Sequence, residues 1–277
     1  MSSQPDRAIH DAEIGGPGGA RTVFLHGLSG QGKNFTQVAK ALEPDLHSLL
    51  VDLPNHGRSA WTDSVDYVDV ADAVAAHLRE GFAADGPVHV VGHSMGGKVA
   101  MVLALRHPEL VDRLVVVDIS PTAKAGTGEF EHLLDSLARL DLDAVDRRAD
   151  ADRLLTADIP DDRVRLFLLQ NLRSTDTGFR WQPHLALLRA ELPTIGDFPD
   201  NSDLGDGTFD HPVLWLAGER SPYIRPEHDA TMRRLFPRTR LVTIKGAGHW
   251  VHSQQPEVFT ASLRYFLDHH SGADAAG

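Results

Sequence analysis

The stretch "VHVVGHSMGG" (residues 88–97) decides the fold, because it joins an apolar, β-branched run to a helix-like pattern through a tight turn. At its centre is the pattern Gly-x-Ser-x-Gly, with Ser94 in the middle. Between a strand and a helix, small residues on both sides of the serine let the chain turn sharply and lift the hydroxyl above the sheet. The pattern by itself is weak evidence, but in this context it favours a nucleophilic Ser94 over an ordinary glycine-rich turn.

Strand-like and helix-like segments alternate on both sides of this turn. We predict strands at 21–27, 47–54, 88–94, 112–120, 213–219 and 239–246, and helices at 33–44, 67–82, 95–108, 226–236 and 256–270. Apolar β-branched strands that alternate with helices are typical of a sheet covered on both faces. The sequence therefore predicts an α/β fold with a mostly parallel central sheet flanked by helices.

One stretch breaks this alternation. Residues 122–208 contain helix-like segments and no clear strand. We interpret them as a helical cap inserted over the carboxyl edge of the sheet, so that 1–121 and 209–277 form the core. The C-terminal "SGADAAG" (271–277) is expected to fray.

Composition narrows the possible partners and location. The net charge of -12 disfavours nucleic acid, whose phosphates need clustered Lys and Arg, and disfavours stable membrane association. The chain has no Cys, which excludes disulfides and thiolate metal sites. Neither an N-terminal apolar segment nor an apolar run of the ~20 residues that span a bilayer is present in the sequence. We expect a cytoplasmic monomer or weak dimer.

The candidate base lies in "IKGAGHWVHSQQPEVF" (244–259). Where a serine nucleophile sits on a strand–turn–helix, the acid follows it in the chain and the histidine comes last. His249 directly follows a strand-like run and a Gly-x-Gly turn, whereas the competing His252 is nearer the next helix. We therefore expect His249 to be the base. Asp52, in "VDLPNHGRSAW" (51–61), precedes Ser94 and is interpreted as a loop-shaping residue.

The segment "VFLHGLSG" (23–30) ends the first core strand, where a backbone N–H is expected to face the nucleophile. An oxyanion hole needs two such donors, and we assign the N–H groups of Leu28 and Met95. His26 by itself is more typical of a residue that pins a loop by hydrogen bonds. As substrate-binding candidates we nevertheless list four residues: His26, His93, Phe167 and Trp181.

Several of these motifs resemble the α/β-hydrolase superfamily over about 20–121 and 211–270. Within it, "HGLSGQGKNF", "DLPNHGRS", "GHSMGGKVAM" and "VVVDISP" are similar to the YbfF-type bacterial esterases and their mitochondrial abhydrolase-domain relatives. "FLLQNL" and "FRWQPHLALL" of the cap resemble that branch more loosely. The resemblance implies hydrolysis of a small-molecule carboxylic ester or acyl thioester through an acyl-enzyme, with no metal and no cofactor.

The acid is absent from its usual place. Most members of the superfamily carry an Asp shortly after the strand that corresponds to "VLWLAGERSPYI" (213–224), where this chain has Ser221. The resemblance to the YbfF-type branch implies that the acid is instead Asp118, at the end of the preceding core strand. The alternative is that Asp118 only caps the loop before Pro121. Glu219 is expected to point away, and the acids of 196–210 are by default solvated turn residues.

Two other functions stay open at this point. The same residues serve C–C bond lyases and hydrolases, which generally keep the acid after the later strand. The fold also serves non-catalytic ligand or partner binding. A serine-reactive fluorophosphonate separates an enzyme from a binding protein, and activity on simple esters separates an esterase from a lyase.

Overall fold

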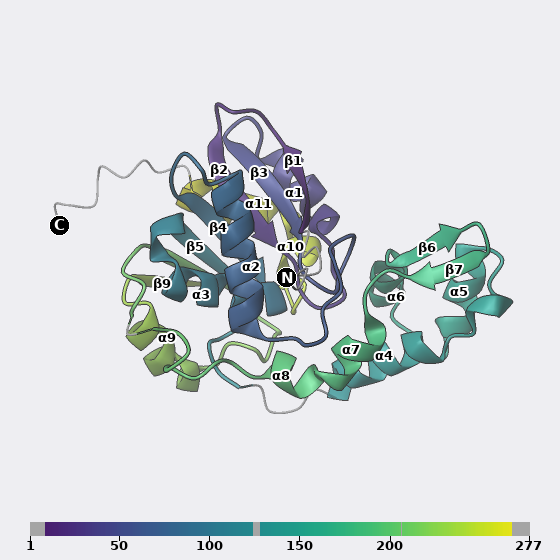
Figure 1. The fold of residues 1–277 in the computed structure, drawn as a ribbon. Coiled ribbons are helices and arrows are strands. Elements are labelled where there is room, and N and C mark those ends of the chain that lie inside the picture. The colour runs from purple at the N-terminus through teal and green to yellow at the C-terminus, as the bar shows by residue number, and fades with distance from the viewer. Residues whose placement is uncertain (1–8, 124–127, 206, 268–277) are drawn as a thin grey trace, which may run out of the picture.

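A seven-stranded sheet forms the centre of the molecule in a computed structural model that describes residues 9–123, 128–205 and 207–267 (Figure 1). The strands are β1 (His10–Ile14), β2 (Ala20–Leu25), β3 (Leu46–Asp52), β4 (Val88–His93), β5 (Val111–Val117), β8 (Val213–Gly218) and β9 (Thr239–Ile244). Their order across the sheet is β1-β3-β2-β4-β5-β8-β9. Every neighbouring pair is parallel except β1 and β3. The predicted α/β fold is confirmed, and β1 is the strand that the sequence did not indicate.

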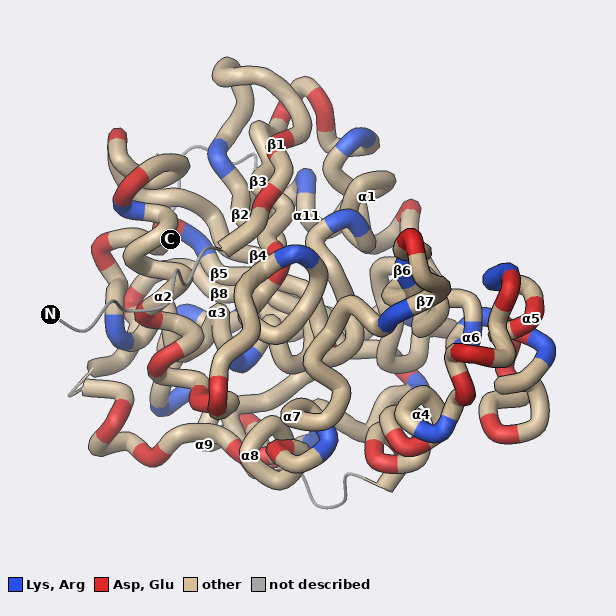
Figure 2. The backbone as a smooth tube through the Cα atoms, turned by 45° about the vertical axis from the view of Figure 1, so that its right-hand side comes forward, with Lys and Arg blue, Asp and Glu red and all other residues tan. Residues whose placement is uncertain are grey.

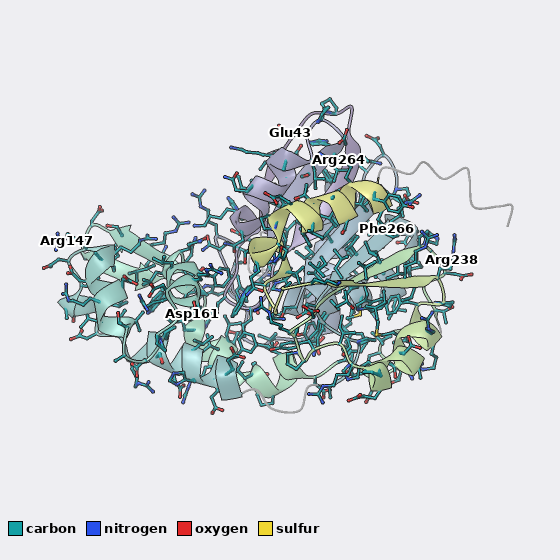
Figure 3. All side chains as sticks on the ribbon, turned by 180° about the vertical axis from the view of Figure 1, so that it is seen from behind. Glu43, Arg147, Asp161, Arg238, Arg264 and Phe266 are labelled. Carbon is teal, nitrogen blue, oxygen red and sulfur yellow. The ribbon has the colours of Figure 1, made fainter. Side chains whose placement is uncertain are left out.

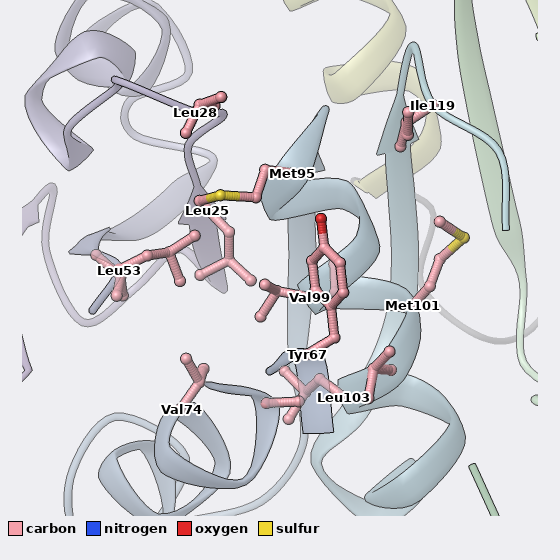
Figure 4. Packing of buried hydrophobic residues seen from close by; sticks show 14 of the residues in the cluster. Leu25, Leu28, Leu53, Tyr67, Val74, Met95, Val99, Met101, Leu103 and Ile119 are labelled. Atoms are coloured by element: carbon pink, nitrogen blue, oxygen red, sulfur yellow. The ribbon is translucent and has the colours of Figure 1, made fainter. Parts of the chain in front are cut away.

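Helices cover both faces of this sheet. On one face lie α2 (Tyr67–Glu80), α3 (Met95–Arg106) and α9 (Asp229–Leu235), whose apolar side chains share one buried cluster. Figure 4 shows part of it, with Leu25 of β2, Val99 of α3 and Val74 of α2. On the other face lie 3₁₀-helix η1 (Gly32–Phe35), α1 (Thr36–Ala41), α10 (Val251–Gln254) and α11 (Pro256–Leu267) around a second cluster. Figure 3 shows α11 lying across the back of the sheet.

The segment between β5 and β8, called the insertion below, forms a lobe beside the sheet (Figure 1). It consists of α4 (Gly128–Arg139), η3 (Leu142–Ala144), α5 (Arg148–Leu155), α6 (Asp162–Leu169), β6 (Leu172–Thr175), β7 (Gly178–Trp181), α7 (Leu185–Ala190) and α8 (Leu192–Gly196). Its buried leucines continue the cluster that contains α2 and α3. Acidic and basic residues are interspersed along its backbone (Figure 2).

The expectation of no strand in this segment was wrong, because β6 and β7 pair as an antiparallel hairpin. Leu172 pairs with Trp181, and Arg173 pairs with Arg180. Each strand has four residues, and the burial of β6 is confined to Leu172 and, in part, Arg173. Strands this short give no apolar run, so the pattern that reveals the core strands has nothing to detect here.

A buried lysine anchors the end of the insertion to the core. Lys98 on α3 is 2% exposed, and its Nζ donates to the carbonyl oxygens of Gly196 at 2.7 Å and Asp197 at 2.5 Å. Carbonyls at a helix end lack intrahelical partners, so a cation placed there satisfies them and interacts favourably with the helix dipole. Lys98 thereby fixes where the chain leaves α8.

Two predicted elements, the last helix and the frayed tail, extend past the residues that the structure describes. The last helix ends at Leu267 among them, and the frayed tail predicted at 271–277 lies outside them. Within residues 9–123, 128–205 and 207–267, no helix combines the length and apolar character needed to cross a bilayer.

Candidate active site

Ser94 lies at the turn between β4 and α3 in a rare backbone conformation. Its φ is 52° and its ψ is -119°, a combination that residues with a Cβ seldom adopt and that persists only where the surroundings impose it. Close packing imposes it here, because a methyl group on Gly96 would lie 2.4 Å from the carbonyl oxygens of Leu25 and His26. Gly96 therefore lets α3 sit against the end of β2, which holds Ser94 above the sheet.

His249 is the imidazole that reaches Ser94. It lies on the loop after β9, and its Nε2 is 2.9 Å from Ser94 Oγ. The competing His252 lies on α10 and packs instead against Phe35 and His93, with ring centroids 5.0 Å and 4.8 Å apart. The structure brings together Ser94 and His249 and places His252 behind them.

Asp118 lies at the end of β5 and contacts the other side of the same imidazole. Its Oδ2 is 2.8 Å from His249 Nδ1, and the residue is fully buried. A carboxylate only accepts, so Nδ1 carries the proton and Nε2 is free to accept from the Ser94 hydroxyl. Asp118, His249 and Ser94 thus form a continuous hydrogen-bonded line.

Gly218, the last residue of β8, and Ser221, on the loop that follows, orient the Asp118 carboxylate. Gly218 N–H donates to Oδ1 at 2.9 Å, and the Ser221 hydroxyl donates to Oδ2. Because β5 and β8 are hydrogen-bonded neighbours, their ends lie side by side. The Ser221 hydroxyl thus holds a carboxylate supplied from the end of β5, the neighbouring strand in the sheet.

The other candidate acids are engaged elsewhere. Glu219 Oε2 accepts from Gly246 N–H at 2.9 Å, which turns it away from the imidazole as expected. Asp52 accepts from the N–H groups of Gly32 at 2.7 Å and Arg58 at 2.9 Å, and it shapes the loops after β2 and β3.

Four rings surround the His249 imidazole, which restricts its motion. Tyr223 stacks on it with centroids 4.1 Å apart and an interplanar angle of 20°. His93, Trp250 and Phe130 lie at 4.9, 5.8 and 6.2 Å. Burial raises the pKa of Tyr223 above its usual range. Tyr223 was not singled out from the sequence, since a tyrosine in a loop carries no pattern that indicates stacking.

His93 is buried against the His249 ring, and its role in substrate binding stays a prediction. It is 4% exposed, its Nε2 donates to the His249 carbonyl at 2.9 Å, and burial holds its pKa well below the usual range. A neutral ring whose Nε2 proton is used in this way supports the loop that carries His249.

His26 also holds backbone rather than facing the open site. Its Nε2 accepts from Leu53 N–H at 2.9 Å, and its Nδ1 donates to the Gly27 carbonyl at 2.8 Å. Burial lowers its pKa to about 4. Both ring nitrogens are therefore used, which agrees with the loop-pinning alternative, and substrate binding by His26 stays a prediction.

The loop that follows β2 approaches the nucleophile closely. A methyl group on Gly27 would lie 3.2 Å from Ser94 Cβ. Gly30 N–H donates to the Gly27 carbonyl at 2.9 Å, which closes a four-residue turn with Leu28 at its second position. Met95 is the first residue of α3, where an N–H has no partner within the helix. Both segments chosen for backbone donors therefore border Ser94.

The two aromatic candidates of the insertion lie in different surroundings. Trp181 packs on the hydrophobic cluster, and its Nε1 donates to the Leu137 carbonyl at 3.0 Å, so its polar atom is used inside the insertion. Phe167 on α6 faces Trp250, with centroids 6.5 Å apart. It lines a groove of about 1070 Å³ between α6 and the helices α1, α10 and α11. Phe130 of the insertion thus contacts the base itself, and Phe167 contacts Trp250 beside it.

This geometry agrees with a match to a known family. A sequence profile described as "alpha/beta hydrolase fold" matches residues 23–256, which include Ser94, Asp118 and His249. The chain belongs to the α/β-hydrolase family.

Similar proteins with assigned names indicate the branch of the family to which this α/β-hydrolase belongs. It is 37% identical to mouse sn-1-specific diacylglycerol lipase ABHD11 over 255 residues, which are 88% of this chain and 80% of that protein. It is 27% identical to esterase YbfF of Escherichia coli K12 over 250 residues, 89% and 92% of the two chains. A solved structure of a marine microorganism esterase matches with a TM-score of 0.87 and 31% identity, covering 93% of this chain and 98% of that chain. The predicted branch is confirmed, and hydrolase activity is supported.

Proposed function

We propose that this α/β-hydrolase cleaves carboxylic esters through an acyl-enzyme formed on Ser94. The observation that carries the proposal is the line of hydrogen bonds from Ser94 Oγ through His249 to Asp118. A serine hydroxyl is a weak nucleophile until a base accepts its proton, and this line provides a base already oriented by a buried carboxylate.

In the first step, Ser94 Oγ attacks the carbonyl carbon while its proton passes to His249 Nε2. The imidazolium keeps its Nδ1 proton, which stays hydrogen-bonded to Asp118. Because Asp118 is fully buried, its charge is poorly screened and favours the imidazolium as it forms.

The tetrahedral intermediate needs donors for the oxygen that becomes negative. We assign these to the backbone N–H groups of Leu28, on the loop after β2, and Met95, the first residue of α3. When the intermediate collapses, the ester C–O bond breaks and the leaving alcohol takes the proton from His249 Nε2. A water molecule then repeats the sequence on the acyl-enzyme, releasing the carboxylic acid and restoring Ser94.

Ester substrates are favoured over thioesters by the names of the relatives. The mouse relative is named a diacylglycerol lipase and the bacterial relative an esterase. An acyl thioester reacts by the same steps and is the second substrate class. The insertion acts in this proposal as a cap over the base, with Phe130 and Phe167 beside the path of the acyl chain.

The first experiment measures hydrolysis of a short p-nitrophenyl ester and fluorophosphonate labelling by the wild type, Ser94→Ala and Asp118→Asn. Ser94→Ala is expected to lose both signals. Asp118→Asn is expected to lose two or more orders of magnitude in kcat while staying folded, since the comparable change in a serine protease costs ~10⁴. Asp200→Asn, an exposed acid on the competing loop, is the matched control and is expected to keep its activity.

Each alternative has its own outcome. Near-wild-type activity in Asp118→Asn contradicts the assignment of the acid. A wild type that is labelled but inert on esters favours a C–C bond lyase or hydrolase. A wild type that is neither labelled nor active favours a binding protein.

A further inference from the structure

Two sequence motifs that the triad does not use meet next to it. "HGLSGQGKNF" (26–35) follows β2, and "FLLQNL" (167–172) joins α6 to β6 in the insertion. They are linked by side-chain amides. Asn171 Nδ2 donates to the Ser29 carbonyl at 2.7 Å, and Gln31 Nε2 donates to Asn171 Oδ1 at 2.6 Å. We call these contacts the amide clasp.

The main chain dictates which way the amides point. The Ser29 carbonyl only accepts, so the Asn171 atom facing it must be the NH₂ group. Gln31 Nε2 also lies 3.2 Å from the Gln170 carbonyl, which again requires a donor. Asn171 is 1% exposed and Gln31 is 2% exposed, so water does not replace these partners readily.

The clasp acts on a turn that needs support. Ser29 has a φ of 59°, in the left-handed region that residues with a Cβ avoid. It is the third residue of the Gly27–Gly30 turn, a position where glycine is usual when φ is positive. His26 holds this turn from the core by its bond to the Gly27 carbonyl. Asn171 holds it from the insertion by its bond to the Ser29 carbonyl.

Leu28 lies between these two fixed carbonyls. Its N–H is the oxyanion donor assigned above, and a donor stabilises the transition state only if it already points at the developing charge. We propose that Asn171 is a positioning residue that, through the Ser29 carbonyl, aims the Leu28 N–H at the oxyanion. This inference rests on the proposed function, and it makes the insertion part of the catalytic arrangement as well as a cover.

Other contacts between the insertion and the core provide a comparison. Trp61 Nε1 donates to the Gln182 carbonyl at 3.2 Å, and Gln182 N–H donates to the Asn171 carbonyl at 2.9 Å. The Trp61 bond therefore holds the same part of the insertion but is not made to the Gly27–Gly30 turn. If the insertion only needs to be attached, loss of this bond and loss of the clasp have the same consequence. If Asn171 positions the donor, only loss of the clasp changes catalysis.

The decisive variant is Asn171→Asp, which keeps the shape and the acceptor for Gln31 but sets a carboxylate against the Ser29 carbonyl. We expect kcat for a p-nitrophenyl ester to fall about 10- to 100-fold with KM nearly unchanged, which is less than the full loss of an oxyanion donor. The inhibition constant of a trifluoromethyl ketone, which forms a tetrahedral adduct on Ser94, should rise by a similar factor. Trp61→Phe and the exposed Asn201→Asp are expected to match the wild type in both measurements.

The pH dependence of kcat/KM in Asn171→Asp separates a positioning role from a merely structural one. When the new carboxyl group is protonated, its O–H donates to the Ser29 carbonyl as the Asn171 amide does. Burial raises the pKa of such a group. The ratio of kcat/KM between Asn171→Asp and the wild type should therefore rise as the pH is lowered from about 8 to about 5.5.

The outcomes separate this inference from the function on which it rests. A folded Asn171→Asp with wild-type kcat and ketone affinity overturns the inference, as does an equal loss in Trp61→Phe. If Asn171→Asp does not fold, Gln31→Met decides, because it removes the bonds that orient Asn171 and should lower kcat in the same direction. A wild type that is inert on esters and unlabelled by fluorophosphonate overturns the proposed function and this inference together, whereas an active wild type confines any failure to the clasp.

Discussion

The two halves of the candidate site are held by different parts of the molecule. The acid and base half depends on the ends of neighbouring core strands, where Gly218 and Ser221 donate to Asp118 and Asp118 meets His249. The turn that carries Leu28 is held from the core by His26 and from the insertion by Asn171. The hydrogen bonds of the first half therefore come from the core alone, whereas those of the second are shared between the core and the lobe beside it.

This difference has a physical origin. Strands β4, β5, β8 and β9 are parallel neighbours, so their carboxyl ends meet at one edge and bring short loops together. The hydrogen bonds between groups on these loops need no residue of the insertion. The Gly27–Gly30 turn is left open on one side, where an inserted segment can reach its backbone. Changes in the insertion are thus expected to tune transition-state stabilisation and substrate choice while leaving the Ser94–His249–Asp118 line intact.

The largest effect is expected from moving the acid within the core half. Asp118→Ser should lower kcat by about 10³-fold or more, because His249 loses the group that holds its tautomer. Adding Ser221→Asp to this variant should recover about 10-fold or more, since the Ser221 hydroxyl contacts the same carboxylate oxygen that His249 contacts. The measurement is kcat for a p-nitrophenyl ester in the two variants.

The loop after β8 already contains another acid, Glu219, which serves as an internal control for this experiment. Glu219 remains in the single variant, so its low activity would show that a carboxylate elsewhere on the loop does not suffice. No recovery in the double variant would mean that Ser221 only approaches Asp118 and does not occupy a position from which an acid can serve His249.

The second effect concerns the core support of the Leu28 turn. Burial lowers the pKa of His26 to about 4 from its ordinary value of 6.5, so His26 is neutral in the folded protein over a range where the unfolded chain binds a proton. Its contribution to stability is complete above pH 6.5 and is lost as the pH falls from 6.5 towards about 4. Between these values, His26→Asn should make the pH dependence of the unfolding free energy shallower by up to about 1.4 kcal/mol per pH unit.

Urea unfolding at several pH values between these limits measures that slope. Leu154→Ala, which removes an exposed side chain that does not titrate, serves as the control and should keep the wild-type slope. Equal slopes in wild type and His26→Asn would contradict a neutral buried His26. Burial also lowers the pKa of His56 to about 3 and of His252 to about 4, so part of the slope persists in the variant.

The smallest effect is expected at the insertion's contact with the substrate. Phe167→Ala should raise KM for a long-chain ester about 3- to 10-fold relative to a short-chain ester, because an acyl chain loses part of the apolar surface against which it is buried. Steady-state kinetics on esters of two chain lengths measures the ratio. Leu154→Ala, an exposed leucine of α5 and 45% accessible, is the control. A ratio that does not change would place the acyl chain away from α6.

Some residues of the candidate site were predictable because short sequence patterns around them indicate their position and chemistry. Ser94 lies in a strand–turn–helix with small neighbours, and His249 follows the last strand, so chain order and turn chemistry identify them. Asp118 required the resemblance to a family branch, since an Asp at a strand end is compatible with a simple loop cap. Tyr223 and Asn171 gave no local signal, because stacking on a ring and donating to a distant carbonyl depend on contacts across the fold.

The sequence by itself determined the alternation of strands and helices, and it indicated Ser94 as the candidate nucleophile and the order of the residues around it, because these follow from short-range periodicity and steric limits on turns. The tertiary structure alone decided that Ser221 holds the Asp118 carboxylate, that His26 and His93 support backbone, and that Asn171 reaches the Leu28 turn from 142 residues away in the chain, counted from Ser29. Such contacts arise when strand order and packing bring distant segments together, and no local pattern encodes which segments will meet.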